Sequence, residues 1–269
     1  MDFVEYGNPE GRIVVYLHGV PGSIEECSVF DSHAKNYNLR ILSFDRFSIN
    51  NTLDREAYYQ ALANQIKQIA GTEPIDLIGF SIGAHVALEI SAVLKDQVGQ
   101  LHLISAAAPI SGGDFLDHMA GGTVFKLAMK RPWLFSLLTQ YQRLMAIVAP
   151  GLLFSMLFAS AAGADRALCA DREFKQSITE LLKHCFQRRS SGYLRDVNCY
   201  VTWSGELSCH SSGAKLWHGT EDNWSPPAMA TYLANGIAGG ASVEELEGLS
   251  HYSCLYAAAP KICAQLAAG

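Results

Sequence analysis

Short apolar runs recur along the chain, and most are followed by a stretch in which apolar residues return at helical spacing. Such runs, rich in Val, Ile, Leu and aromatic residues, favour buried strands. We predict strands over residues 12–17, 40–44, 75–80, 101–106, 214–218 and 243–246, and helices over 55–70, 82–95, 226–236 and 252–267. This alternation indicates an α/β fold with a mostly parallel, doubly wound sheet and helices on both faces.

The pattern changes between residues 113 and 196, where strand signals vanish and Leu, Phe, Met and Ala dominate at helical spacing. Pro132 suits the first turn of one helix, Pro150 and Gly151 interrupt it, and Asp171 suits the N-cap of another. We therefore predict a helical lid (cap) inserted after the sixth strand of the sheet. The predicted domains are a core of residues 1–112 and 197–269 and a lid of residues 113–196.

One part of this segment is long and apolar enough to raise the question of a membrane span. Arg143 and Asp165 bracket 21 uncharged residues, a length that can cross a bilayer. Pro150 and Gly151 lie in the middle of that stretch and argue against a continuous span. We expect two short lid helices that cover a site, with no stable membrane span, and contact with a membrane surface stays open.

Composition narrows the class of protein. A chain of 269 residues suits one α/β domain with an insertion, and a net charge of −6 argues against a nucleic-acid partner. No basic segment followed by an apolar one opens the chain, so we expect a cytoplasmic protein. Seven scattered cysteines without Cys-x-x-Cys spacing favour reduced thiols over a disulfide or metal framework. The sequence sets no oligomeric state.

The sequence GFSIG at residues 79–83 lies between a predicted strand and a predicted helix. Gly-x-Ser-x-Gly in that context is the signature of a nucleophile elbow, a sharp turn that exposes the hydroxyl of its serine. Gly79 and Gly83 lack a Cβ and let the strand and the helix approach closely. Ser81 is therefore the candidate nucleophile.

Three further motifs follow predicted strands: HGVPG at 18–22, HGTED at 218–222 and GLSH at 248–251. With GFSIG between them, the chain resembles the α/β-hydrolase superfamily, whose reactive residues occur in the order Ser, Asp, His. The resemblance implies that His251 is the base for Ser81 and that Asp222 orients its imidazole. The oxyanion donors would be the backbone N–H groups of Val20 and Ile82.

These residues predict a serine hydrolase that cleaves a small-molecule carboxylic ester or thioester with an apolar acyl part through an acyl-enzyme intermediate, with no cofactor and no metal. The positive lid, with 11 Lys and Arg against 7 Asp and Glu, leaves an anionic leaving group open. Hydrolysis of a C–C bond or a lactone, and cofactor-free perhydrolysis, remain alternatives on the same triad. A non-catalytic binding protein on this fold is a third possibility. The candidate pocket residues are Phe154, Met156, Phe158 and Trp224.

Overall fold

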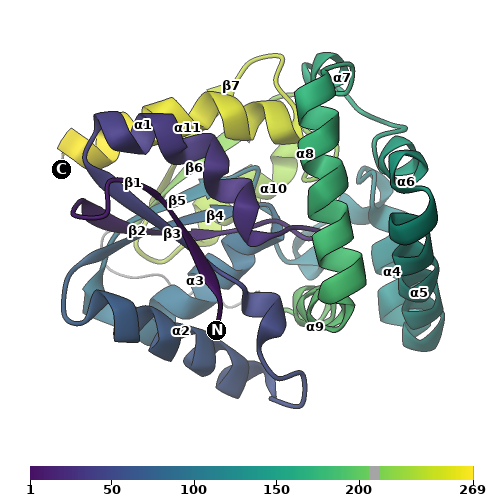
Figure 1. Ribbon diagram of the computed structural model, residues 1–269, viewed down its shortest axis with the longest axis horizontal. Coiled ribbons are helices and arrows are strands. Elements are labelled where there is room, and N and C mark those ends of the chain that lie inside the picture. Colours follow the sequence, from purple (N-terminus) through teal and green to yellow (C-terminus); the bar gives the residue numbers. More distant parts are fainter. Residues whose placement is uncertain (206, 208–212, 269) are drawn as a thin grey trace.

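The computed structural model describes residues 1–205, 207 and 213–268 (Figure 1). Its seven-stranded sheet has the order β1-β3-β2-β4-β5-β6-β7. β1 (Phe3–Gly7) runs antiparallel to β3 (Leu39–Phe44), and the other neighbouring pairs are parallel. The other strands are β2 (Arg12–Leu17), β4 (Ile75–Phe80), β5 (Val98–Ile104), β6 (Ala214–Gly219) and β7 (Ala241–Leu246). The predicted α/β class is confirmed.

All six predicted strands are present. The structure has one further strand, the N-terminal β1, which the sequence pattern did not predict. β1 is an edge strand without a fully buried residue, so its sequence lacks the continuous apolar run of the inner strands. The strand predicted over 101–106 occurs as Val98–Ile104. It ends there because Ser105 adopts a positive φ of 46°, which is outside the β region.

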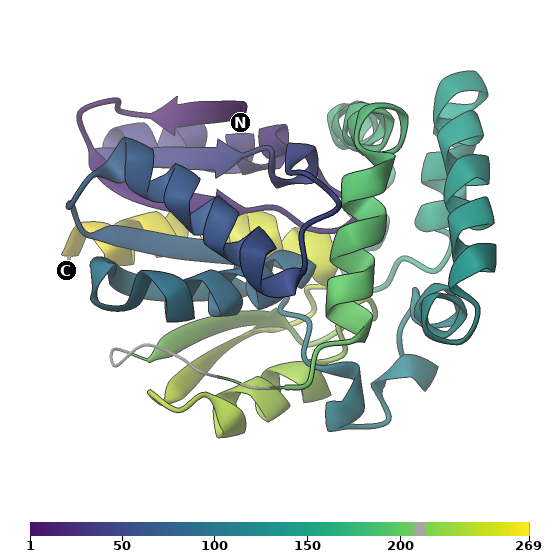
Figure 2. The same cartoon turned by 90° about the horizontal axis from the view of Figure 1, so that it is seen from below.

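Helices cover both faces of the sheet (Figures 1 and 2). α1 (Asp31–Asn36) and α11 (His251–Ala268) contact each other on one face, and α2 (Arg55–Ala70) and α3 (Ile82–Leu94) contact each other on the opposite face. α10 (Pro227–Gly236) packs on β6 and β7. Because both faces are covered, every residue of β4 is buried.

The chain between β5 and β6 is helical, as its pattern predicts. Pro132 begins α5, and Asp171 caps α8 by accepting a hydrogen bond from the N–H of Phe174 at 2.8 Å. The described part of this segment contains six α-helices: α4 (Gly122–Lys130), α5 (Pro132–Val148), α6 (Pro150–Leu157), α7 (Asp165–Leu168), α8 (Arg172–Lys183) and α9 (Ser190–Val201). A π-helical turn, His184–Arg188, follows α8.

The predicted position of the insertion needs correction. The helices follow β5, the fifth strand along the chain, and not a sixth. Only one strand, the antiparallel β1, precedes β2. The insertion therefore follows five strands, β1 to β5. The expected boundary after residue 196 falls inside α9. Among the described residues, no helix has the length and apolarity needed to cross a bilayer.

The cysteines contribute packing surface. Within the described residues, Cys27, Cys185, Cys199, Cys254 and Cys263 are buried free thiols and Cys169 is a partly exposed one. Cys209, the seventh, lies outside the described residues.

Candidate active site

Ser81 occupies the turn between β4 and α3 with a φ of 57° and a ψ of −125°. A positive φ at a non-glycine residue costs about 1–3 kcal/mol and persists only where surrounding contacts enforce it. Close backbone contacts surround this turn. A Cβ on Gly79 would lie 2.6 Å from the Cα of Ala84, and one on Gly83 would lie 2.0 Å from the carbonyl oxygen of Leu17. The serine is thus held in a strained turn at the carboxyl edge of the sheet.

His251 and Asp222 meet at the same edge. His251 is the first residue of α11, and its Nδ1 lies 2.9 Å and 3.1 Å from the two carboxylate oxygens of Asp222. Asp222 is fixed in turn, because its Oδ1 accepts hydrogen bonds from the N–H groups of Trp224 and Ser225, each at 2.9 Å. With Nδ1–H donating to the carboxylate, the Nε2 of His251 carries a lone pair that can accept a proton.

Asp222 stays ionised although it is buried. Burial alone would raise the pKa of its carboxyl, but the charge and hydrogen bond of His251, together with His218 and the Ser225 N–H, hold that pKa below its usual range. His218 lies 3.8 Å away, and burial lowers its own pKa. Within the part of the chain that the structure describes, His251 is therefore the only histidine whose imidazole forms a hydrogen bond with the Asp222 carboxylate.

Aromatic rings and one backbone bond fix the position of the imidazole. The ring of Trp224 stacks on His251 with centroids 5.2 Å apart, and Phe80, the neighbour of Ser81, packs against it at 4.8 Å. The Ser105 hydroxyl donates to the carbonyl oxygen of His251 at 3.1 Å. The histidine is thus held beside the elbow from several sides.

The two residues whose amides are expected to bind an oxyanion lie at the same cavity as Ser81. Val20 and Ile82 both line it. Within the described residues, neither backbone N–H donates a hydrogen bond to another group of the chain. Ile82 is the first residue of α3, where an N–H has no partner in its own helix. Both donors are therefore available to a ligand.

A buried carboxylate lies behind this loop. The Oε2 of Glu26 accepts hydrogen bonds from the N–H of Gly19 at 2.8 Å and from the hydroxyl of Tyr16 at 2.9 Å. Burial raises the pKa of Glu26 to about 7, although these two bonds and the charges of Arg46 and His251 act in the opposite direction. Glu26 thus fixes the residue that precedes Val20.

Comparison with known families agrees with this geometry. The model of a family described as the alpha/beta hydrolase family matches residues 14–266. The chain belongs to the alpha/beta hydrolase family. No curated protein matches this sequence.

Solved structures resemble this alpha/beta hydrolase over nearly its whole length. A bromoperoxidase from Bacillus anthracis has a TM-score of 0.69 at 16% identity, over 98% of this chain and 93% of that one. MGS-M2, an alpha/beta hydrolase enzyme from a Medee basin deep-sea metagenome, has a TM-score of 0.68 at 17% identity, over 98% and 92%. An esterase from Exiguobacterium antarcticum has 0.63 at 17%, over 99% and 93%. At such identities the likeness concerns the fold.

The cavity beside Ser81 in this alpha/beta hydrolase has a volume of about 80 Å³. Its walls are mostly apolar, and many of them come from the helical insertion. One polar group stands out, because the Oε1 of Gln142 is buried and has no hydrogen-bond partner among the described residues. The lining comprises Val20, Pro21, Ser81, Ile82, Ala107, Met119, Gly121, Val124, Phe125, Gln142, Leu157, Tyr193, Val197, Trp224 and Ser225.

The predicted pocket residues are only partly brought together. Trp224 lines the cavity, but Phe154, Met156 and Phe158 do not. Phe158 packs behind Trp224 with centroids 5.3 Å apart, Phe154 stacks on Phe158 at 4.7 Å, and Met156 is 52% exposed. The phase of α6 directs Leu157 to the cavity instead, and the sequence leaves that phase undetermined.

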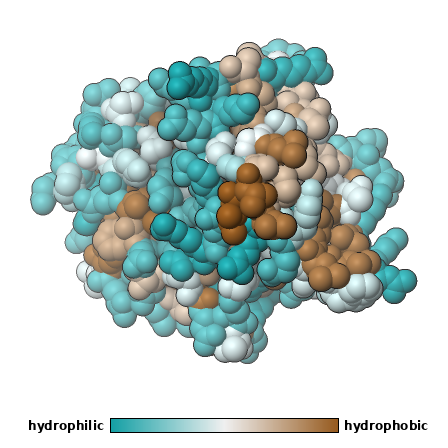
Figure 3. Space-filling view, turned by 45° about the vertical axis from the view of Figure 1, so that its right-hand side comes forward, coloured by the Kyte–Doolittle hydropathy of each residue, from teal (hydrophilic) through white to brown (hydrophobic). Residues whose placement is uncertain are grey.

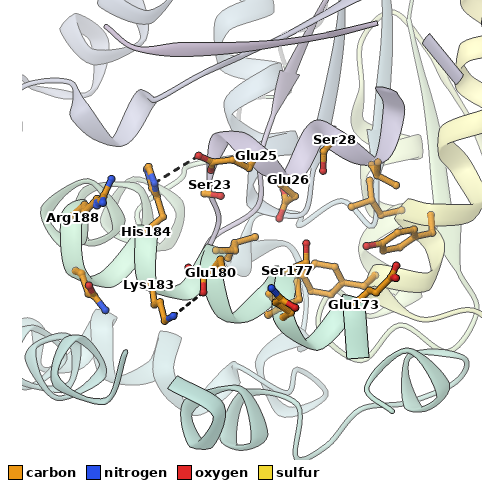
Figure 4. A pocket seen from close by; sticks show the side chains of 18 residues that line it. Ser23, Glu25, Glu26, Ser28, Glu173, Ser177, Glu180, Lys183, His184 and Arg188 are labelled. Atoms are coloured by element: carbon orange, nitrogen blue, oxygen red, sulfur yellow. Dashed lines mark hydrogen bonds and ion pairs between the residues drawn. The ribbon is translucent and has the colours of Figure 1, made fainter. Parts of the chain in front are cut away.

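A larger hollow of about 800 Å³ lies on another side of the molecule, between α8, α11 and the 3₁₀ segment Ile24–Phe30 (Figure 4). Glu25, Glu26, Glu173 and Glu180 line it, and its cations are partly paired, since Lys183 binds Glu180 at 2.7 Å. Ser81 does not line it. Glu26 and Tyr252 border the hollow and also contact the site through Gly19 and His251.

Sequence reasoning missed several residues that support the site. Asp165, from α7, is buried and accepts hydrogen bonds from the N–H groups of Tyr252 and Ser253 at the start of α11. Arg46 donates to the carbonyl oxygen of His18 at 2.8 Å. Glu26, Asp165 and Arg46 stand outside any motif, and each follows or precedes another charged residue in the sequence, so no local signal sets them apart from surface charges. Among the described residues, no three His, Cys, Asp or Glu side chains are grouped to hold a metal ion.

Proposed function

We propose that this alpha/beta hydrolase is a serine hydrolase that cleaves an ester or thioester with a short apolar acyl group. One observation carries the proposal. Ser81, on a strained turn, lines an apolar cavity together with Trp224, whose ring stacks on His251, and with Val20 and Ile82, whose N–H groups have no partner among the described residues. Nucleophile, base and oxyanion donors are the parts that acyl transfer requires.

The reaction follows from these positions. The Oγ of Ser81 attacks the acyl carbon while the Nε2 of His251 takes its proton, and Asp222 stabilises the imidazolium. The carbonyl oxygen becomes an oxyanion that accepts hydrogen bonds from the N–H groups of Val20 and Ile82. When this tetrahedral intermediate collapses, the bond between the acyl carbon and the leaving alcohol or thiol breaks, and the leaving group receives the proton from His251. Water then attacks the acyl-enzyme by the same route and releases the acid and free Ser81.

The helices α4–α9 serve as the lid in this proposal. Met119, Val124, Gln142, Leu157 and Tyr193 all come from the segment between β5 and β6 and line the cavity. A cover of this kind excludes water and gives an apolar wall to the acyl group.

Labelling tests the nucleophile directly. A fluorophosphonate probe should modify Ser81 alone, as located by mass spectrometry. Ser81→Ala and His251→Ala should each lower kcat by about 10⁴-fold or more, by similar factors, because the residues act as a unit. Ser91→Ala is the matched control, since Ser91 is buried on α3, the helix that follows Ser81, and its hydroxyl bonds only the Leu88 carbonyl within the described chain. Full labelling of Ser81→Ala contradicts the proposal.

The cavity volume predicts the acyl length. An apolar cavity of about 150 Å³ holds benzene, so one of about 80 Å³ suits an acyl group of about two to four carbons. Nitrophenyl acetate and butyrate should therefore react faster than the octanoate. Leu157→Ala should move the preference toward longer chains, whereas Leu152→Ala, on the exposed side of the same helix, should leave it unchanged. An unchanged preference in both variants contradicts this assignment of the cavity.

Product analysis distinguishes the rival reactions. An acid and an alcohol or thiol in equal amounts support ester or thioester hydrolysis. A hydroxy acid as the single product indicates a lactonase, and a peracid formed with hydrogen peroxide indicates perhydrolysis. A bound but unchanged ester indicates a binding protein.

A further inference from the structure

The outer side of α5 and α6 carries an unusual number of exposed apolar side chains. We call this surface the α5–α6 face. Trp133, Leu137, Leu144 and Val148 are 63%, 58%, 53% and 64% exposed, and their spacing places them on one side of α5. The face comprises Trp133, Leu137, Tyr141, Leu144, Ile147, Val148, Leu152 and Met156.

The core of the protein does not need these side chains, because other residues of the same helices already pack against it. The opposite side of the same helices is already buried through Phe135, Met145, Leu153 and Phe154, so the helices are apolar around most of their circumference. Of the fourteen exposed large hydrophobic side chains in the described part of the chain, nine lie between residues 129 and 156. Exposure this concentrated marks an interaction surface. α5 and α6 lie at the end of the molecule opposite the C-terminus (Figures 1 and 2), and Figure 3 shows hydrophobic side chains gathered there.

The charges within the segment that carries this face are all positive. No Asp or Glu occurs between residues 118 and 164, although the whole chain has a net charge of −6. Lys130, Arg131 and Arg143 are exposed along its margin, and none of them makes an ion pair within the described residues. The surface that covers this face must therefore be both apolar and negatively charged at its edge.

We propose that the α5–α6 face docks on an anionic lipid surface, with α5 and α6 lying in the plane of the interface. Apolar side chains enter the acyl boundary, Trp133 and Tyr141 sit at headgroup depth, and Lys130, Arg131 and Arg143 meet the lipid phosphates. A second copy of the chain fits less well, because a self-complementary interface would pair this segment, which has positive charges and no Asp or Glu, with the same segment of the other copy. The docking does not require catalysis. Since Gln142 and Leu157 of the same helices line the Ser81 cavity, it places that cavity next to the membrane.

Vesicle binding tests the proposal. Ser81→Ala protein should co-sediment with vesicles that contain about 30% phosphatidylglycerol in phosphatidylcholine, and about tenfold less with phosphatidylcholine alone. Leu137→Ser/Leu144→Ser should weaken binding to the anionic vesicles by at least about tenfold. Lys130→Glu/Arg131→Glu should weaken it at least as much and remove most of its sensitivity to about 0.5 M salt. The inactive background separates this test from the proposed hydrolase activity.

Matched controls use exposed apolar residues elsewhere. Tyr37→Ser and Val243→Ser replace side chains that are 41% and 37% exposed away from the α5–α6 face, and both should bind vesicles like the parent. Thermal midpoints close to the parent value exclude unfolding as the cause of a loss. Equal binding to charged and neutral vesicles, absence of binding, or a dimer in solution that Leu137→Ser/Leu144→Ser dissociates would each overturn the proposal.

Discussion

Glu26 connects the protonation of a buried carboxyl to the loop that presents Val20. Its Oε2 accepts both available hydrogen bonds, from Gly19 and Tyr16, while its Oε1 is buried without a partner among the described residues. A proton on Oε1 therefore leaves both bonds intact and removes a buried charge. This explains physically why burial raises the pKa of Glu26 to about 7.

The raised pKa predicts a pH-dependent stability. The folded chain still holds the Glu26 proton between about pH 4.5 and 7, where the unfolded chain has released it, so the free energy of unfolding falls as pH rises through this window. The loss should be on the order of 2–3 kcal/mol. Glu26→Gln mimics the protonated form and should lack this loss. Urea unfolding at pH 5 and pH 8 measures it, and an equal pH response in parent and variant contradicts the assignment.

Sequence motifs identify those site residues whose backbone geometry depends on their immediate neighbours in the sequence. Ser81, Asp222 and His251 each lie just beyond a strand in a recognisable motif, and the structure brings His251 and Asp222 into hydrogen-bond contact as the resemblance implies. Glu26 has no such local signature. Its environment depends on Tyr16 and Gly19, which approach it only after the sheet has formed.

At the scale of elements, α11 carries the imidazole of His251, the proposed base, on its first residue, so the proposed function requires the N-terminus of that helix to be fixed. Asp165 does this from α7, with its two carboxylate oxygens 3.0 Å and 2.7 Å from the N–H groups of Tyr252 and Ser253. A carboxylate there satisfies two unpaired donors and interacts favourably with the helix dipole. The inserted helices thus contribute to the position of His251.

Asp165→Ala should therefore lower both stability and catalysis. The lost cap should cost about 1–2 kcal/mol, and kcat should fall while KM changes little, because His251 loses its support. Asp171→Ala is the control, since Asp171 caps α8 through one hydrogen bond from the N–H of Phe174 and its loss should lower stability without changing kcat. Urea unfolding and steady-state kinetics measure the two effects. Equal kcat losses in both variants would contradict a positioning role for Asp165.

Whether a segment forms a strand or a helix was predictable where the spacing of its apolar residues fits only one of the two. β2 and β4 occur over the predicted residues because most of their residues are apolar and buried. The rotation of α6 was not predictable, since Phe154, Leu157 and Phe158 are all apolar. Contacts with Trp224, Phe174 and Tyr252 decide that Phe158 packs and Leu157 faces the cavity.

At the scale of the molecule, a buried charge network joins the helical insertion to α2 and to the turn that follows β3. Asp196 of α9 accepts hydrogen bonds from Arg46 at 2.8 Å, from Arg195 at 3.0 Å and from the hydroxyl of Tyr58 at 3.1 Å. The side chains of Arg46 and Asp196 are 0% and 1% exposed. Arg46 and Asp196 lie 150 positions apart in sequence, so no local pattern indicates their pairing, and the sequence predicted no role for either.

Asp196→Asn should be strongly destabilising, because it keeps the shape of the side chain but leaves Arg46 and Arg195 buried without their counter-ion. Breaking a buried pair in this way costs about 3–5 kcal/mol. Glu180→Gln is the control, since it breaks the Lys183 pair at a residue that is 63% exposed and should cost under about 1 kcal/mol. The urea midpoint should fall in Asp196→Asn with an unchanged slope. Activity should fall as well, because Arg46 also holds the carbonyl of His18 beside the loop proposed to bind the oxyanion. If both variants unfold at the parent's midpoint, the insertion is held to the rest of the chain by apolar packing and not by this network.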